Sequence, residues 1–204
     1  TAQGDLFFAM FAGHGEFARA VIAPGDGEEA FYLSAEAMNL AWKFQIPVII
    51  LADKHLSEST FVAEIDENVS LQAPKLWDGE GEYKRYLQTE DGVSPLAFPG
   101  NAKAVVKANS YEHDEYGITT EQAELVAKGN EKRVRKMKAL EEYLKTKETV
   151  KTYGNKGSDI ALVFWGSTKG AAKEVAEDLG ILGVQPLYLK PLPTWELSKL
   201  LEGK

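Results

Sequence analysis

The stretch Ile46-Pro47-Val48-Ile49-Ile50-Leu51-Ala52 decides the fold class of this 204-residue chain. Its unbroken apolar run is typical of a parallel strand that is covered on both faces. Upstream, residues 19–23 predict another short strand, and apolar residues at a helical period predict a helix over 27–44. Asp26, with Glu29 three residues later, has the spacing of a capping box at the start of that helix. Strand, helix and strand together predict a parallel βαβ unit.

A second unit of the same kind is predicted near the C-terminal end of the sequence. Residues 160–165 form a buried strand pattern, 169–179 a helix and 184–189 another strand. Each unit offers only about two parallel strands, whereas average sheets contain roughly five or six. We therefore predict an α/β fold with two incomplete parallel-sheet βαβ domains, at 1–70 and 153–204. We expect the missing strands to come from outside these residues, so that the chain is part of a larger subunit.

A loop-rich connector, residues 71–152, is expected to join the two units. Turn signals crowd residues 70–117, with one short strand candidate at 104–106. Thr119 and Gln122 have capping-box spacing and predict a long helix over 119–147. A basic run, 132–138, lies on this helix between acidic residues. It indicates a solvated helix face or a subunit contact more than an RNA-binding surface.

Composition excludes several classes of protein. The chain has 31 acidic and 23 basic residues and a formal net charge of -8, which argues against a nucleic-acid partner. It contains no cysteine, so disulfides, Cys-ligated zinc, iron–sulfur ligation and thiol nucleophiles are excluded within it. No apolar stretch approaches the roughly 20 residues of a membrane span. We expect a cytoplasmic protein with no membrane partner.

Four short motifs could carry chemistry, and each also has a structural interpretation. Gly13-His14-Gly15-Glu16 offers an acid or base, or a solvated glycine turn. Asp53 ends the apolar strand where α/β sheets place their ligands, and His55 follows it. Glu112-His113-Asp114-Glu115 could ligate a divalent cation, hold a protonated imidazole, or form an acidic surface turn. Gly166-Ser167-Thr168 could hold an anion on backbone N–H groups, or simply turn the chain.

Taken together, these blocks resemble the alpha subunit of the 2-oxoacid:ferredoxin oxidoreductases, the 2-oxoglutarate type above all. The likeness covers nearly all of the chain, and three stretches carry it. They are Gln3-Gly4-Asp5-Leu6 with Gly13-His14-Gly15-Glu16 and Ala23-Pro24-Gly25-Asp26; residues 109–117 with the basic run from Glu131 to Met137; and residues 164–170 with Lys190-Pro191-Leu192-Pro193. The first resembles the latter part of a pyrimidine-binding domain, and the last resembles the start of a transketolase C-terminal-like domain.

The resemblance implies thiamine diphosphate chemistry with Mg²⁺, shared with a beta subunit. A 2-oxo acid, 2-oxoglutarate or pyruvate, would be decarboxylated, coenzyme A would take the acyl group, and electrons would pass to ferredoxin. Iron–sulfur clusters would belong to partner subunits, for which gamma and delta subunits are candidates, and none to this chain. A non-catalytic assembly module and a transketolase-like enzyme without ferredoxin are the alternatives.

The resemblance also implies where site residues should lie. The activating glutamate is expected upstream of Thr1, so we assign no catalytic acid or base, and we assign no metal ligand. The residues expected near the cofactor are Gln3, Asp5, His14 and Glu16. The residues expected at a domain or subunit contact are Gly166, Ser167, Thr168, Glu112 and His113. This chain alone, without its partner subunits, is expected to be inactive.

Overall fold

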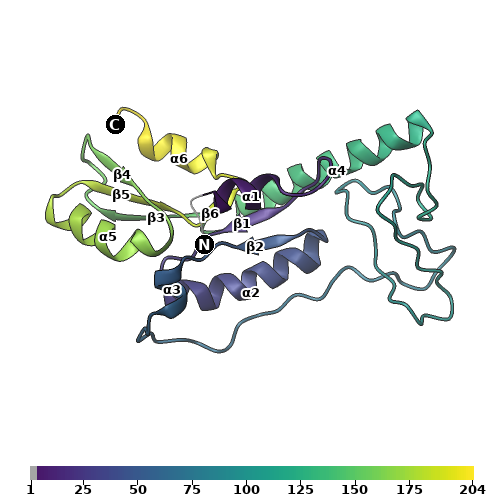
Figure 1. Cartoon of the computed structure of the whole chain (residues 1–204), viewed down its shortest axis with the longest axis horizontal. Coiled ribbons are helices and arrows are strands. Elements are labelled where there is room, and N and C mark those ends of the chain that lie inside the picture. Colours follow the sequence, from purple (N-terminus) through teal and green to yellow (C-terminus); the bar gives the residue numbers. More distant parts are fainter. Residues whose placement is uncertain (1–3) are drawn as a thin grey trace.

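Two three-stranded sheets organise the chain in the computed structural model, which describes residues 4–204 (Figure 1). The first sheet has the order β2-β1-β6, formed by Val48–Ile50, Ala20–Ile22 and Tyr188–Lys190. Strands β1 and β2 are parallel, with Ala20 opposite Val48, and helix α2, Gly27–Phe44, connects them. The predicted first βαβ unit is therefore confirmed.

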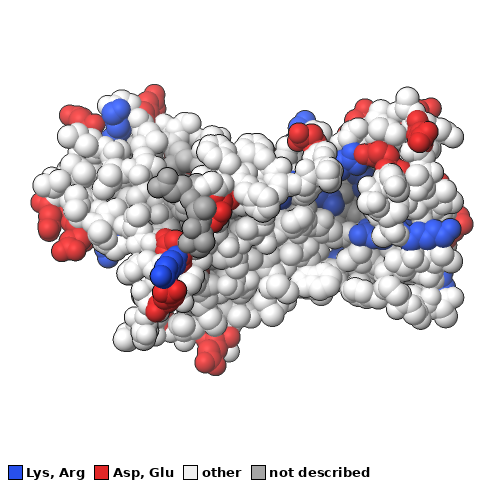
Figure 2. Space-filling view, in the orientation of Figure 1, with Lys and Arg blue, Asp and Glu red and all other residues white. Residues whose placement is uncertain are grey.

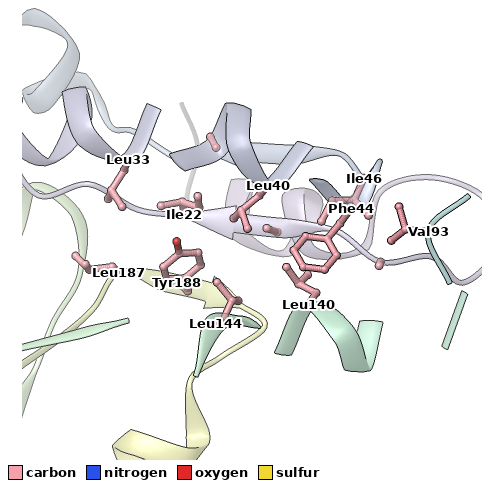
Figure 3. Close-up of a cluster of buried hydrophobic side chains, with 13 residues drawn as sticks. Ile22, Leu33, Leu40, Phe44, Ile46, Val93, Leu140, Leu144, Leu187 and Tyr188 are labelled. Carbon is pink, nitrogen blue, oxygen red and sulfur yellow. The ribbon is translucent and has the colours of Figure 1, made fainter. Parts of the chain in front are cut away.

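Helices cover both faces of this first sheet. Helix α1, Asp5–Phe11, packs through Ala9 against Val21 and Ala23 on one face. The opposite face, carrying Ala20 and Ile22, packs against α2, because neighbouring strand residues point to opposite sides. Figure 3 shows this core, in which Leu140 and Leu144 of helix α4, Ala123–Leu144, complete the layer beside Leu40, Phe44 and Tyr188.

Helix α2 spans Gly27–Phe44, as the apolar period predicts. The Asp26 carboxylate accepts the backbone N–H of Glu29 at 2.9 Å, so this half of the capping box is present. The reciprocal bond differs from a standard box, because Glu29 accepts the N–H of Gly25 at 2.7 Å. In a standard box the Glu29 side chain would accept the N–H of the N-cap residue Asp26. Here it accepts the N–H of the preceding residue, Gly25, and it is buried.

The second sheet has the order β3-β5-β4, formed by Val150–Gly154, Leu182–Pro186 and Ala161–Val163. Strands β4 and β5 are parallel, and they are connected by the short 3-10 turn Gly166–Thr168 and helix α5, Lys169–Asp178. Helix α6, Thr194–Leu201, packs through Leu197 on the core of this sheet.

Three features of the sheets differ from the sequence-based predictions. Each sheet contains one antiparallel strand, so neither is purely parallel. The predicted strand 184–189 is two strands, because the chain passes at Leu187 from β5 in the second sheet to β6 in the first. Strand β2 lies at a sheet edge and is covered only in part: Val48 packs on one core cluster and Ile49 on the other, whereas Ile50 is 39% exposed.

The connector also differs from its prediction. After the short helix α3, Lys54–Glu58, the chain runs to residue 122 in turns and isolated bridges, and residues 104–106 form no strand. Helix α4 spans Ala123–Leu144, four residues shorter at its start than predicted. The predicted capping box is not formed, because the Thr119 hydroxyl accepts a bond from Asn109 at 3.2 Å and bridges within the connector.

The two sheets are physically linked, since β6 belongs to the C-terminal segment and pairs with β1. Strand β3 also spans the boundary drawn at residue 153. The division into domains at 1–70, 71–152 and 153–204 stays a prediction. Within residues 4–204, no helix has both the length and the apolar character needed to cross a membrane.

Candidate functional site

The predicted cofactor edge lies around helix α1 and the turn that follows it. Gln3 is outside the described residues, and Asp5 is half-buried in the first turn of α1. His14 and Glu16 are exposed on the turn. The turn needs glycine at position 13, where φ is +109° and a Cβ would lie 3.1 Å from the Phe17 ring.

Two cations hold the C-terminal end of α1 in place. Lys190 Nζ donates to the carbonyl oxygen of Met10 at 2.7 Å, and Arg19 donates to that of Ala9 at 3.2 Å. Both acceptors belong to the last turn, where positive charge is favourable. The carboxyl-terminal strand β6 therefore positions the edge on which His14 and Glu16 lie.

At the carboxyl end of β2, Asp53 joins the two halves of the chain. Its side chain caps α3 through the N–H of Leu56 at 2.9 Å, and it accepts the hydroxyl of Ser167 and, at 3.4 Å, the Ser167 N–H. Burial tends to raise the pKa of Asp53, but the Ser167 hydrogen bonds outweigh it and lower that pKa. The predicted ligand position is thus filled by a contact with the 166–168 turn, in which Gly166 adopts φ +65°.

A second polar cluster joins the same two halves, centred on the buried carboxylate of Glu29. It accepts Lys169 Nζ at 2.7 Å, Lys151 Nζ at 3.1 Å and Gln185 Nε2 at 2.9 Å. Lys169 also donates to Asp26. Burial acts to raise the pKa of Glu29, yet the bonds from Lys169 and Gly25 lower it overall. The Glu29 cluster is therefore a charged contact between α2 and the second sheet.

The 112–115 motif does not converge on a common point. Glu112 pairs with Arg133 of α4 at 2.7 Å, and Asp114 accepts the N–H groups of Tyr116 and Ile118 at 2.9 Å. Glu115 pairs with Lys84 at 2.9 Å. His113 stacks on Tyr86 with ring centroids 3.5 Å apart. Among residues 4–204, no group of three or more His, Asp or Glu side chains is placed to hold a metal ion. The contacts of the motif are ion pairs, backbone hydrogen bonds and ring stacking.

A cavity of about 480 Å³ lies between the 112–115 motif, the first half of α4 and the loops that precede β1 and β2. One face of α4 turns Lys128, Lys132 and Lys136, spaced four residues apart, towards it. Lys132 is only 9% exposed and Lys136 is half-buried. The interpretation of the basic run as a solvated face is wrong at these two positions, although Lys138 is exposed.

The two small sheets are coupled, helices cover both faces of the first, and the Glu112–Arg133 ion pair holds the connector to α4. These features define a mixed α/β class of protein built from linked βαβ units. Comparison with known sequences is specific. A family model described as "Pyruvate flavodoxin/ferredoxin oxidoreductase, thiamine diP-bdg" matches residues 1–132, and the chain belongs to this family.

Relatives extend the likeness over the whole chain. The chain is 40% identical over its full length to "2-oxoacid:ferredoxin oxidoreductase subunit alpha" of Saccharolobus solfataricus, and covers 34% of that protein. It is 38% identical to "2-oxoacid:ferredoxin oxidoreductase 2, subunit alpha" of Aeropyrum pernix, again over its full length and 33% of the relative. The chain thus spans about one third of these relatives.

A solved structure agrees with both comparisons. It is a 2-oxoglutarate:ferredoxin oxidoreductase from Magnetococcus marinus with 2-oxoglutarate, coenzyme A and succinyl-CoA bound. The match has a TM-score of 0.85 and 32% sequence identity, and covers 97% of this chain and 36% of that one. The α/β fold class predicted from the sequence is confirmed by this agreement, and the antiparallel strands β6 and β3 make the sheets mixed.

The described residues do not by themselves enclose a thiamine diphosphate molecule. His14 and Glu16 are exposed, and neither they nor Asp5 line any of five well-formed cavities among residues 4–204. Because His14 and Glu16 are exposed, this edge could cover only one side of a cofactor, and other residues would have to enclose the remaining sides. We therefore derive no chemical step through the cofactor from these residues.

The sequence-based search missed Glu29 as a buried charge, Lys169 as its partner, and Lys132 as a buried cation. Glu29 and Lys169 lie 140 positions apart, so no local pattern connects them. A usable signal existed for Lys132: lysines at 128, 132 and 136 share one face of a helix whose apolar residues are few.

Proposed function

We propose that this chain is part of the alpha subunit of a 2-oxoacid:ferredoxin oxidoreductase. The observation that carries the proposal is the 40% identity to such a subunit along the entire chain. The reaction would convert a 2-oxo acid, coenzyme A and two oxidised ferredoxins to an acyl-CoA, carbon dioxide, two reduced ferredoxins and a proton. The substrate would be 2-oxoglutarate or pyruvate.

The cofactor and partner assignments follow from the family. Thiamine diphosphate, with Mg²⁺ shared with a beta subunit, would supply the chemistry that cleaves the carbon–carbon bond. Electrons would leave through iron–sulfur clusters of partner subunits, since these 204 residues contain no cysteine. Ferredoxin would accept them, gamma and delta subunits would be further members of the assembly, and we place the complex in the cytoplasm.

Within this assembly, we propose that Asp5, His14 and Glu16 contribute one wall beside the cofactor. Their support is their position on an exposed edge that α1 and β6 hold in a fixed place. The 166–168 turn, which bonds to Asp53, and the Glu29 cluster would keep the two halves of the chain in one orientation behind that wall. These groups position the edge and take no part in the reaction.

The decisive experiment assays the assembled complex for 2-oxo-acid-dependent reduction of ferredoxin, with coenzyme A present or omitted. We expect reduction only with coenzyme A, with 2-oxoglutarate and pyruvate compared directly. An assembled complex with no activity on any 2-oxo acid would favour an assembly module. Acyl transfer without ferredoxin reduction would favour a transketolase-like enzyme.

The wall is tested separately by His14→Asn and Glu16→Gln in the same complex. We expect both variants to weaken thiamine diphosphate binding, seen as a higher cofactor concentration for half-maximal activity. His55→Asn is the matched control, because His55 lies on α3, away from this edge. Equal cofactor requirements in all variants would refute the wall assignment and leave the family assignment intact.

A further inference from the structure

The cavity beside Lys128, Lys132 and Lys136 of α4 combines the volume, the apolar wall and the polar groups that are typical of a small-molecule site. Its volume of about 480 Å³ lies within the roughly 300–1,000 Å³ typical of ligand pockets. Phe17, Ile46, Pro47 and Leu125 give it an apolar wall, and the Tyr86 ring lies beside it. Figure 2 shows Lys and Arg atoms in the hollow between the sheet region and the connector.

Positive charge in this cavity exceeds what the neighbouring carboxylates neutralise. Lys132 Nζ donates to the hydroxyl of Ser94, and Lys136 Nζ donates to the carbonyl oxygen of Gln45 at 3.3 Å. Both acceptors are neutral. Arg85 and Arg135 also donate only to neutral oxygens in the described contacts, at 2.7–3.2 Å. Buried cations with neutral partners are costly unless an anion joins them.

The nearby carboxylates are already engaged. Glu112 pairs with Arg133, and Glu115 with Lys84. Asp91 is 4.0 Å from Lys75, and Asp114 accepts backbone N–H groups. At the rim, Lys128 pairs with Glu124 at 2.7 Å. Lys132 and Lys136 are therefore the two cavity-lining cations that form no ion pair with a carboxylate in the described contacts.

We propose that this cavity binds a small organic phosphate, with the phosphate group placed between Lys132 and Lys136. Two ammonium groups match a phosphate dianion, and their N–H donors match its oxygens. The apolar wall would hold the organic part of the ligand. The site lies beside the loops that precede β1 and β2, and Phe17, which lines it, directly follows the edge that carries His14 and Glu16. The proposal does not rest on the proposed function.

Electrostatics supports this geometry. Burial, followed by the nearby charges of Lys136 and Arg85, lowers the pKa of Lys132 to about 7. Burial and then Arg85 lower the pKa of Lys136 to about 8. A bound dianion would raise both pKa values, so binding at pH near 8 should take up protons. The charged and titratable groups facing the two lysines are Arg85, Asp91, Glu112, His113, Asp114, Glu115, Lys128, Arg133 and Arg135.

The test measures binding of ADP, inorganic phosphate and succinate to the natural assembly by titration calorimetry in two buffers that differ in ionisation enthalpy. We expect ADP to bind more tightly than phosphate, with net proton uptake near pH 8. Lys132→Met should weaken ADP binding about tenfold or more and reduce the proton uptake. Lys132→Arg, which keeps the charge, should retain most of the affinity.

Lys138→Met is the matched control, because Lys138 lies on the same helix and is exposed. It should bind ADP as the unsubstituted protein does. Lys136→Met gives a second measurement if Lys132→Met fails to fold. Failure of ADP and phosphate to bind to the natural assembly would overturn the proposal and indicate that a partner's acidic side chain fills the cavity. Equally tight binding of succinate would overturn the phosphate assignment.

Discussion

Replacing Glu29 by glutamine tests whether the Glu29 cluster holds the two sheets together. The Glu29 side chain is 4% exposed and accepts Lys169 at 2.7 Å and Lys151 at 3.1 Å. Removing one partner of a buried ion pair costs about 3–5 kcal/mol. Asp26 remains bonded to Lys169, so we expect the lower end, about 3 kcal/mol.

The loss should depend on pH in a defined direction. The cluster lowers the pKa of Glu29 in the folded chain below its usual 4.5. The stabilising contribution is therefore fully present above pH 4.5 and is lost as pH falls through the folded-state pKa. Since the glutamine side chain of the variant would not titrate, the difference between the two proteins should be largest at neutral pH and shrink in acid.

Urea unfolding at neutral pH and at about pH 3.5 would measure both effects. The matched control is Glu28→Gln, because Glu28 is the neighbouring residue of the same helix and is exposed. A Glu29→Gln protein whose unfolding free energy stays within about 0.5 kcal/mol of the unsubstituted protein at neutral pH would refute the reasoning, since changes of that size are typical of surface sites.

Three further substitutions test packing and the connector. Leu140→Ala should lower the unfolding free energy by about 2–5 kcal/mol, because Leu140 is 0% exposed, whereas Val134→Ala, 49% exposed, should change it little in the same urea series. Gly25→Ala should destabilise the protein by about 1–3 kcal/mol, since the new Cβ would lie 2.7 Å from Lys169, while Gly170→Ala, with open space around it, should not lower the melting temperature. Glu112→Gln removes a half-exposed ion pair worth about 1 kcal/mol or less after solvent screening, and should speed proteolytic cleavage of the connector with little change in melting temperature.

Local patterns predicted the elements that rest on local interactions. Helix α2 was predicted with its correct bounds because Asp26 caps it and apolar residues recur at its period. The two parallel strand pairs followed from short apolar runs. Strand β3 was missed, because residues 150–152 were assigned to the connector and residues 153–154 to the start of the second unit, before its first predicted strand.

The remaining features depend on contacts far apart in the sequence. Residues 184–189 look like a single strand in the sequence, and nothing within them shows that β5 and β6 enter different sheets. Helix α4 begins at Ala123 and not at Thr119, because the Thr119 hydroxyl accepts a hydrogen bond from the Asn109 side chain and does not cap the helix. The basic run could not be interpreted correctly without the connector, because Ser94 and Gln45 bury Lys132 and Lys136.

The pairing of β6 with β1 also bears on how the protein is made. Val21 pairs with Lys190, so β6 can join the first sheet only after residues 51–187, which lie between β2 and β6, have been translated. At about 5–20 residues per second, β1 and β2 wait on the order of ten seconds or longer for that strand. During this time the edge of β1 is open to pairing with other chains. A ribosome-associated chaperone, or early docking of a neighbouring subunit, would protect nascent chains at this stage of synthesis.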